Sequence, residues 1–201
     1  VDGMRDIAAG SREVFNLEQV EVVKGPSSAY GGRDSGGGSI NLVSKTPKLK
    51  DETRISLGAG TDGYLRGTVD ANWQVSSTAA MRLNLMVGQG DVAGRDSVDF
   101  DKWGVGAAIA AGLGTPTTVT ASYYHLDSDQ MPDYGIPLYT KLGGATAPRP
   151  DASGILDVPY DSFYGLKARD YLNNKVDTLT LDVEHRFSDT LALRNVTRYS
   201  Q

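Results

Sequence analysis

The sequence lacks several features on which common functional classes depend. It contains no cysteine, which excludes both a disulfide framework and a thiolate metal site. Its two histidines, His125 and His185, lie far apart and have no partners at metal-ligand spacing, so a zinc site is not supported. No stretch approaches the ~18 consecutive apolar residues that indicate a transmembrane helix. The net charge of -5 argues against a nucleic-acid partner, whose phosphates attract basic proteins.

Catalytic and nucleotide-binding patterns are also missing. Residues 58–63 read G-x-G-x-x-G, but an alternating, strand-like pattern follows instead of the helix that would hold a pyrophosphate. The glycine-rich stretch 25–39 lacks the G-K-S/T ending of a phosphate-binding loop. No Ser-His-Asp or Cys-His arrangement can be argued from the sequence. We therefore predict that the protein is not an enzyme.

One acidic segment leaves a metal site open as an alternative. Asp91, Asp96, Asp99 and Asp101 fall within one predicted loop, and carboxylate oxygens are the ligands that calcium prefers. Neither the glycine nor the terminal glutamate of an EF-hand loop accompanies them, which favours a solvated acidic loop. The prediction is that the chain holds no metal and no cofactor.

Alternation of apolar and polar residues is the dominant pattern from Thr53 onward. Leu65, Val69 and Trp73 fall on one side of an extended strand, and Arg66 and Asp70 fall on the other. Several such stretches exceed the about 5–6 residues of a typical soluble strand and reach the ~9–11 that an outer-membrane strand needs. The pattern predicts seven strands, at about 53–60, 64–75, 79–88, 103–113, 117–126, 176–187 and 191–200.

The connections between these strands alternate in length. Short links are expected at 76–78, 114–116 and 188–190, and long ones at 91–102 and 127–175, with a tight turn at 61–63 as the exception. Short turns at one end and long loops at the other are typical of bacterial outer-membrane barrels. Trp73 and Trp103 are expected near opposite ends of the apolar band, where aromatic girdles lie. A soluble β-sandwich is the alternative, because it also buries one face of each strand.

Residues 20–45 carry the most specific motif, VEVVKGPSSAYGGRDSGGGSINLVSK. Two alternating stretches flank a Gly-Pro turn and a dense set of glycines, which permit positive φ or close backbone packing. The motif resembles the end of the plug domain in TonB-dependent outer-membrane receptors, especially siderophore receptors of the catecholate branch. The opening residues Val1-Asp2-Gly3 resemble a second segment of that plug.

The resemblance implies an all-β fold in two units. Residues 1–48 are expected to be the second half of the plug domain. Residues 49–201 are expected to be the first part of a barrel that has about 22 strands in the whole family. The composition changes over 46–52, where a linker is expected. Because the first half of the plug and the remaining strands are not in this sequence, we expect it to be part of a longer protein.

The resemblance also implies candidate binding residues. Residues just after the Asp-Gly pair face the ligand in this family, which places Arg5, Asp6 and Ser11 near a siderophore. Lys24, with Arg33, is expected to lock the plug to glutamates on the inner barrel wall.

The 127–175 loop supplies a second set of candidates. Aromatic rings and arginines there could stack on an aromatic, anionic ligand and pair with its charge. The equally weighted alternative is that the rings pack the loop against the barrel rim. The candidates in this loop are Tyr134, Tyr139, Arg149, Tyr164 and Arg169.

The function that the resemblance implies is TonB-dependent uptake of a ferric siderophore, of the catecholate type, across the bacterial outer membrane. The iron arrives on the ligand, so no resident cofactor is expected. The expected partners are the ferric siderophore, TonB and outer-membrane lipid. The alternatives are a receptor for cobalamin, sugar or another metal chelate, and a passive structural or adhesive barrel.

Overall fold

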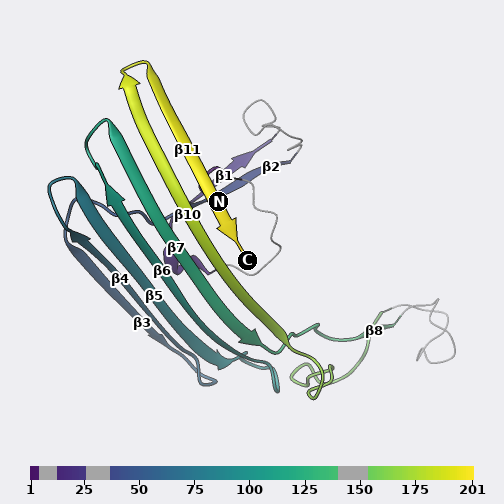
Figure 1. The fold of residues 1–201 in the computed structure, drawn as a ribbon. Helices are drawn as coiled ribbons and strands as arrows, with labels where there is room; N and C mark the ends of the chain where they lie inside the picture. The colour runs from purple at the N-terminus through teal and green to yellow at the C-terminus, as the bar shows by residue number, and fades with distance from the viewer. Residues whose placement is uncertain (5–12, 26–36, 140–153) are drawn as a thin grey trace.

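The computed structural model describes residues 1–4, 13–25, 37–139 and 154–201. Its main element is one seven-stranded antiparallel sheet in the order β11-β10-β7-β6-β5-β4-β3 (Figure 1). This confirms the seven predicted strands. The strands are β3 (Glu52–Ala59), β4 (Leu65–Gln74), β5 (Ala79–Asp91), β6 (Asp99–Ala111), β7 (Thr117–Gln130), β10 (Leu172–Ser188) and β11 (Leu191–Ser200).

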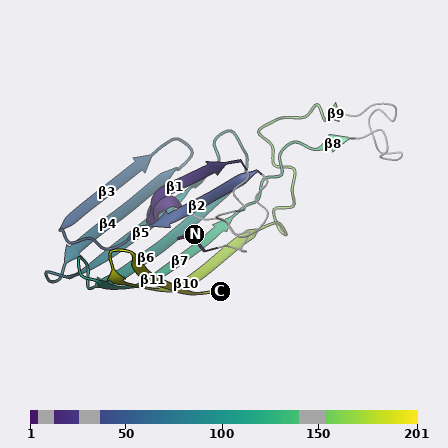
Figure 2. The same ribbon diagram turned by 90° about the horizontal axis from the view of Figure 1, so that it is seen from above.

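A smaller unit, the N-terminal segment, precedes this sheet. It comprises the described residues before β3, with a short 3-10 helix η1 (Val14–Asn16) and the strands β1 (Leu17–Lys24) and β2 (Gly38–Ser44). The two strands pair antiparallel, and Figures 1 and 2 show them on one side of the large sheet. The described residues include no helix long and apolar enough to cross a membrane.

A long connection between β7 and β10 leaves the sheet. It carries the two short strands β8 (Leu138–Tyr139) and β9 (Gly154–Ile155), which pair with one another. Both views show this hairpin stem extending away from the large sheet (Figures 1 and 2).

Four strands extend further toward this end of the sheet than the alternation predicted. β5 and β6 pair as far as Asp91↔Asp99, and β7 and β10 as far as Gln130↔Leu172. The predicted long links at 91–102 and 127–175 were therefore wrong at their ends and narrow to 92–98 and 131–171. Polar residues occupy both faces of these extensions, so the backbone ladder continues where the apolar alternation has stopped.

The polarity of the two sheet faces is the reverse of that in a soluble sandwich. On β5, Arg82, Asn84 and Met86 are buried beneath the N-terminal segment, whereas Met81 and Val87 on the opposite face are exposed. We call these the covered face and the open face. Large exposed side chains of the open face include Ile55, Leu57, Trp73, Leu85, Trp103, Ile109, Tyr123, Leu179, Leu181 and Phe187.

Small residues on β6 make room for η1 on the covered face. The ring of Phe15 is buried and stacks on Tyr124, with 5.7 Å between ring centroids. Met86 and Leu126 complete this small apolar cluster. A Cβ atom at Gly104 would lie 2.7 Å from the ring carbons of Phe15, closer than carbon atoms approach. The glycine therefore permits the helix to dock.

We predict that Gly104→Ala destabilises the contact between η1 and the sheet. The added methyl overlaps Phe15, and overpacking of this kind costs about 1–3 kcal/mol. The free energy of unfolding of the intact, detergent-solubilised protein measures the loss. Gly58→Ala is the matched control, since its Cβ would lie 3.8 Å from the nearest atom, in ordinary contact. Equal effects of the two substitutions would contradict the docking argument.

Candidate functional site

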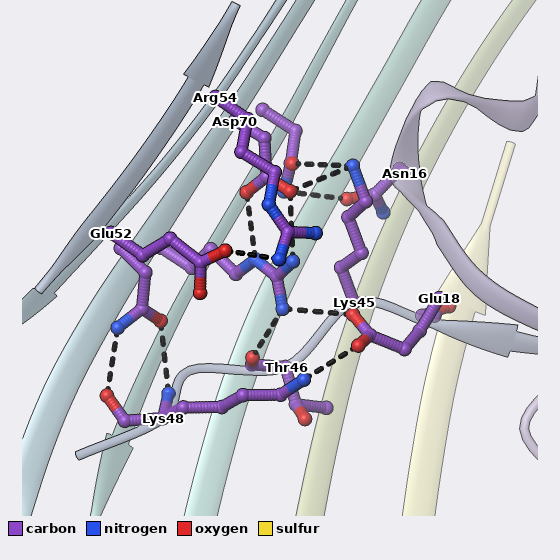
Figure 3. Close-up of polar contacts among 12 residues, drawn as sticks. Asn16, Glu18, Lys45, Thr46, Lys48, Glu52, Arg54 and Asp70 are labelled. Carbon is purple, nitrogen blue, oxygen red and sulfur yellow. Dashed lines mark hydrogen bonds and ion pairs between the residues drawn. The ribbon is translucent and has the colours of Figure 1, made fainter. Parts of the chain in front are cut away.

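The guanidinium of Arg82 is the centre of a polar interface between the N-terminal segment and the covered face. Figure 3 labels Glu18, Thr46 and Asp70, which bind it. The Arg82 side chain on β5 is 6% exposed, and its Nε and Nη2 atoms donate to the two carboxylate oxygens of Asp70 on β4, each at 2.8 Å. Its Nη1 atom donates to the Thr46 carbonyl at 2.9 Å and to Glu18 Oε2 at 3.0 Å. One side chain of the sheet thus binds two stretches of the N-terminal segment.

Lys45 reaches the same carboxylate from the opposite side of the interface. Its Nζ lies 2.9 Å from Asp70 Oδ2, and it donates to the Phe15 carbonyl at 2.7 Å and to Asn84 Oδ1 at 3.3 Å. Asn84 in turn donates from Nδ2 to Asn16 Oδ1 at 3.1 Å. Asp70 is therefore shared between a cation of the sheet and a cation of the N-terminal segment, as Figure 3 shows.

Asn72 holds the chain that leads from β2 to β3. Its Oδ1 accepts from the Lys48 amide at 2.9 Å, and its Nδ2 donates to the Lys48 carbonyl at 2.7 Å and to the Lys50 carbonyl. These bonds satisfy the linker's backbone groups as a neighbouring strand would. The predicted linker at 46–52 is thus bound along the covered face.

Glu18 is the acidic group of the interface on the N-terminal side. Its Oε1 accepts from Lys48 Nζ at 2.5 Å, and this bond, aided by Arg82, holds the pKa of the Glu18 carboxyl below its usual range. A lowered folded-state pKa contributes stability above the unfolded pKa and loses it as the pH falls through the folded one. The contact is therefore fully formed at neutral pH.

Two further acidic residues of the N-terminal segment, Glu13 and Asp2, form ion pairs with other strands. Glu13, just before η1, lies 3.0 Å from Arg66 on β4 and 3.4 Å from Lys102 on β6. Asp2 accepts from the Ser44 amide at 2.7 Å and lies 2.7 Å from Arg198 on β11. The N-terminal segment is thus attached by charged groups to strands across the width of the sheet.

This arrangement suits reversible attachment better than chemistry. The buried cations and carboxylates described above are paired with one another, and the apolar cluster around Phe15 is small. Within the described ranges, no group of three or more His, Asp or Glu side chains is placed to hold a metal ion. The prediction that Asp91, Asp96, Asp99 and Asp101 share one loop was wrong, because Asp91 ends β5 and Asp99 and Asp101 belong to β6.

The structure describes only some of the residues that the sequence singled out for ligand binding. Tyr134 is 83% exposed, the Tyr164 hydroxyl donates to the Pro159 carbonyl at 2.6 Å, and Arg169 lies 3.0 Å from Asp170. No direct contact joins these three candidates in the described part of the loop. Tyr139 lies in β8, and its side chain is not described. Arg5, Asp6, Ser11, Arg33 and Arg149 lie outside the described residues.

Lys24, the residue predicted to lock the plug to the barrel wall, is not part of the interface around Arg82. Lys24 is exposed at the end of β1, and none of the described carboxylates pairs with it. The sequence reading missed Arg82, Asp70 and Glu18. A signal was present, since Arg82 and Asp70 fall on the polar side of long alternating strands, where a charge requires a partner once covered.

Comparison with known proteins places this geometry in a family. No family model matches the chain. The chain is 42% identical to the probable TonB-dependent receptor BfrD of Bordetella pertussis, over 100% of this chain and 26% of that protein. It is 39% identical to the catecholate siderophore receptor Fiu of Escherichia coli K12, over 100% of this chain and 27% of that protein. The chain belongs to the TonB-dependent receptor family.

Solved structures agree with this membership. The chain superposes on the open form of Fiu from E. coli K12 with a TM-score of 0.87 at 38% identity, over 98% of this chain and 30% of that one. For PiuA, a siderophore receptor of Acinetobacter baumannii, the TM-score is 0.88 at 37% identity, over 98% of this chain and 28% of that one.

The chain spans about a quarter of the length of the curated relatives that it matches, 26% of BfrD and 27% of Fiu. BfrD and Fiu are named as receptors, and the Fiu structure is named as that of an import receptor, which agrees with the prediction of a transport receptor rather than an enzyme.

We predict that Arg82→Ala weakens the attachment of the N-terminal segment to the sheet. The substitution removes the cation that Asp70 and Glu18 share, while Lys45 still pairs with Asp70 and Lys48 with Glu18. We therefore expect a loss of about 1.5–3 kcal/mol, the range for hydrogen bonds to charged groups. Urea unfolding of the intact receptor in detergent measures the change. Arg54→Ala is the control, because this arginine pairs with Glu52 but its side chain is 70% exposed. A loss no greater than that of the control would contradict the role of Arg82.

Proposed function

We propose that the receptor containing this chain takes up ferric catecholate siderophores across the bacterial outer membrane with energy delivered by TonB. The observation that carries the proposal is the similarity along the whole chain to Fiu, whose name records a catecholate siderophore ligand. The relevant values are 39% sequence identity and a TM-score of 0.87. The iron is cargo carried by the ligand, so the receptor needs no cofactor.

The proposal assigns residues 1–48 to the plug and 49–201 to the first part of the barrel wall. The polarity of the large sheet supports this assignment. The exposed apolar residues of the open face would meet lipid, and the polar covered face would face a hydrated lumen. Trp73 and Trp103 are both exposed on the open face, near opposite ends of their strands, as two aromatic girdles require.

In this mechanism the ferric siderophore binds between the plug apex and the loops at the β8–β9 end of the sheet. Arg5, Asp6 and Ser11 would contact it from the plug, and Tyr134, Tyr139, Arg149, Tyr164 and Arg169 from the long loop. Arginines pair with the anionic ligand and tyrosines stack on its rings. No bond of the ligand is made or broken.

Release of the plug then requires the polar interface to open. The bonds of Arg82, Lys45 and Asn72 are ones that water can replace as the plug moves, whereas a large apolar interface would resist separation. Lys24 and Arg33 are proposed to pair with glutamates elsewhere on the inner wall. TonB would act through a segment that lies outside this sequence.

We predict that the intact receptor binds a ferric catecholate and that Arg5→Ala weakens binding by ~10-fold or more, since a charge-assisted contact is lost. Deletion of 131–171 should weaken binding further. Fluorescence quenching with the purified receptor measures affinity, with a ferric hydroxamate and cobalamin as competitors. If both variants keep wild-type affinity, the proposed site is wrong.

The same receptor distinguishes transport from passive function. Uptake of the radiolabelled ferric catecholate should occur in cells with TonB and stop in cells without it. If the receptor prefers cobalamin, a sugar or another metal chelate, the proposed function would become uptake of that ligand instead. If the receptor binds no ligand and shows no TonB-dependent uptake, the result would support a passive structural barrel.

A further inference from the structure

Arg95, in the turn between β5 and β6, binds both limbs of the long loop. This loop comprises the described residues of 131–171. Its first limb runs from Met131 to β8, and its second limb runs from β9 to Tyr171. The Nε and Nη2 atoms of Arg95 donate to the two carboxylate oxygens of Asp133 in the first limb, at 2.7 and 2.8 Å. Its Nη1 atom donates to the Tyr160 carbonyl in the second limb. One guanidinium therefore joins three segments.

The surrounding backbone strengthens this contact. The Asp96 amide donates to the Asp161 carbonyl at 2.6 Å, and the Met131 amide donates to the Asp99 carbonyl at 3.0 Å. The Arg95 side chain is only 13% exposed although it lies in a turn. Its hydrogen bonds, with that of the Gly135 amide, hold the pKa of the Asp133 carboxyl below its usual range. The pair is therefore ionised at neutral pH.

The turn and the second limb are themselves ordered by local bonds. The turn closes through the Val92 amide, which donates to the Val98 carbonyl at 2.7 Å. In the second limb, the Leu166 amide donates to Asp170 Oδ2 at 2.8 Å. A Cβ atom at Gly165 would lie 2.4 Å from the Phe163 ring, so this limb is closely folded. The turn and the second limb are thus each held by local contacts. The Arg95 bond between them therefore fixes where the second limb lies relative to the sheet.

We propose that Arg95 is a positioning residue for ligand capture. Its guanidinium fixes both limbs of the long loop at their base and sets where the β8–β9 stem stands beyond the sheet. This inference rests on the proposed function, because it assigns the long loop a part in binding the ferric siderophore. Arg95 itself does not contact the ligand, and its effect passes through the placement of Tyr134 and Tyr164.

The first test needs no ligand. Arg95→Ala in the intact receptor should raise hydrogen exchange in peptides covering 92–98, 131–138 and 156–161 by about tenfold, since their shared attachment is lost. Arg95→Lys, which cannot form the forked pair with Asp133, should behave similarly. Arg194→Ala is the matched control, because Arg194 forms a pair with Asp182 at 2.6 Å near the opposite end of the sheet. Wild-type exchange in both limbs of Arg95→Ala would overturn the inference.

A spectroscopic readout separates positioning from general stability. Spin labels at Leu138→Cys in β8 and Val87→Cys on the open face report the distance between the stem and the sheet. Both positions are exposed, and the chain has no cysteine of its own. Arg95→Ala should broaden the distance distribution, while Arg194→Ala should leave it unchanged. A narrow distribution in Arg95→Ala would contradict the inference.

Ligand binding completes the test. Arg95→Ala should slow association of the ferric catecholate by about three- to tenfold, because the loop must find its place during binding. If the loop loosens but association stays at the wild-type rate, Arg95 holds the loop without positioning the site, and the inference is wrong. If the wild-type receptor binds no ferric catecholate, the proposed function fails, while the exchange and distance results still decide whether Arg95 fixes the loop.

Discussion

A buried guanidinium requires hydrogen-bond acceptors, and Arg82 obtains them from both the large sheet and the N-terminal segment. Asp70 comes from the neighbouring strand, while Glu18 and the Thr46 carbonyl come from the N-terminal segment. An isolated charge in such a place would be strongly unfavourable, so the sheet and the segment that covers it depend on one another. The Lys45 bond to the same carboxylate makes that dependence mutual.

The interface therefore differs from an ordinary protein core. Its apolar part is the small cluster of Phe15, Met86 and Leu126, and most of the remainder is ion pairs and hydrogen bonds. Large apolar side chains lie instead on the open face, away from the N-terminal segment. This division supports the proposed assignment to a plug and a barrel wall. In that assignment lipid would stabilise the open face, and the covered face would be held by contacts that can exchange with water.

The sequence predicted the strands better than it predicted their contacts. Period-two alternation located all seven strands of the large sheet, because most carry large apolar side chains on one face and polar or small residues on the other, although the pattern in β11 is irregular. It failed at the ends near Asp99 and Gln130, where both faces are polar and only the backbone ladder shows that the strand continues.

Side-chain partners were harder to predict. Lys45 was visible as the end of the glycine-rich motif, but nothing in the sequence shows that it meets Asp70. Arg95 likewise could not be matched with Asp133, since their contact depends on how the long loop returns to the sheet. The roles of Lys24 and of the ligand-binding residues stay predictions.

The central claim is that the open face meets lipid while the covered face is enclosed. Single spin labels at 83, 85, 105 and 109 on the open face and at 80 and 108 on the covered face test it directly in the membrane-reconstituted receptor. The account predicts that the first set collides with dissolved oxygen and is shielded from a water-soluble nickel reagent. Open-face labels that are accessible to the nickel reagent and not to oxygen would contradict it.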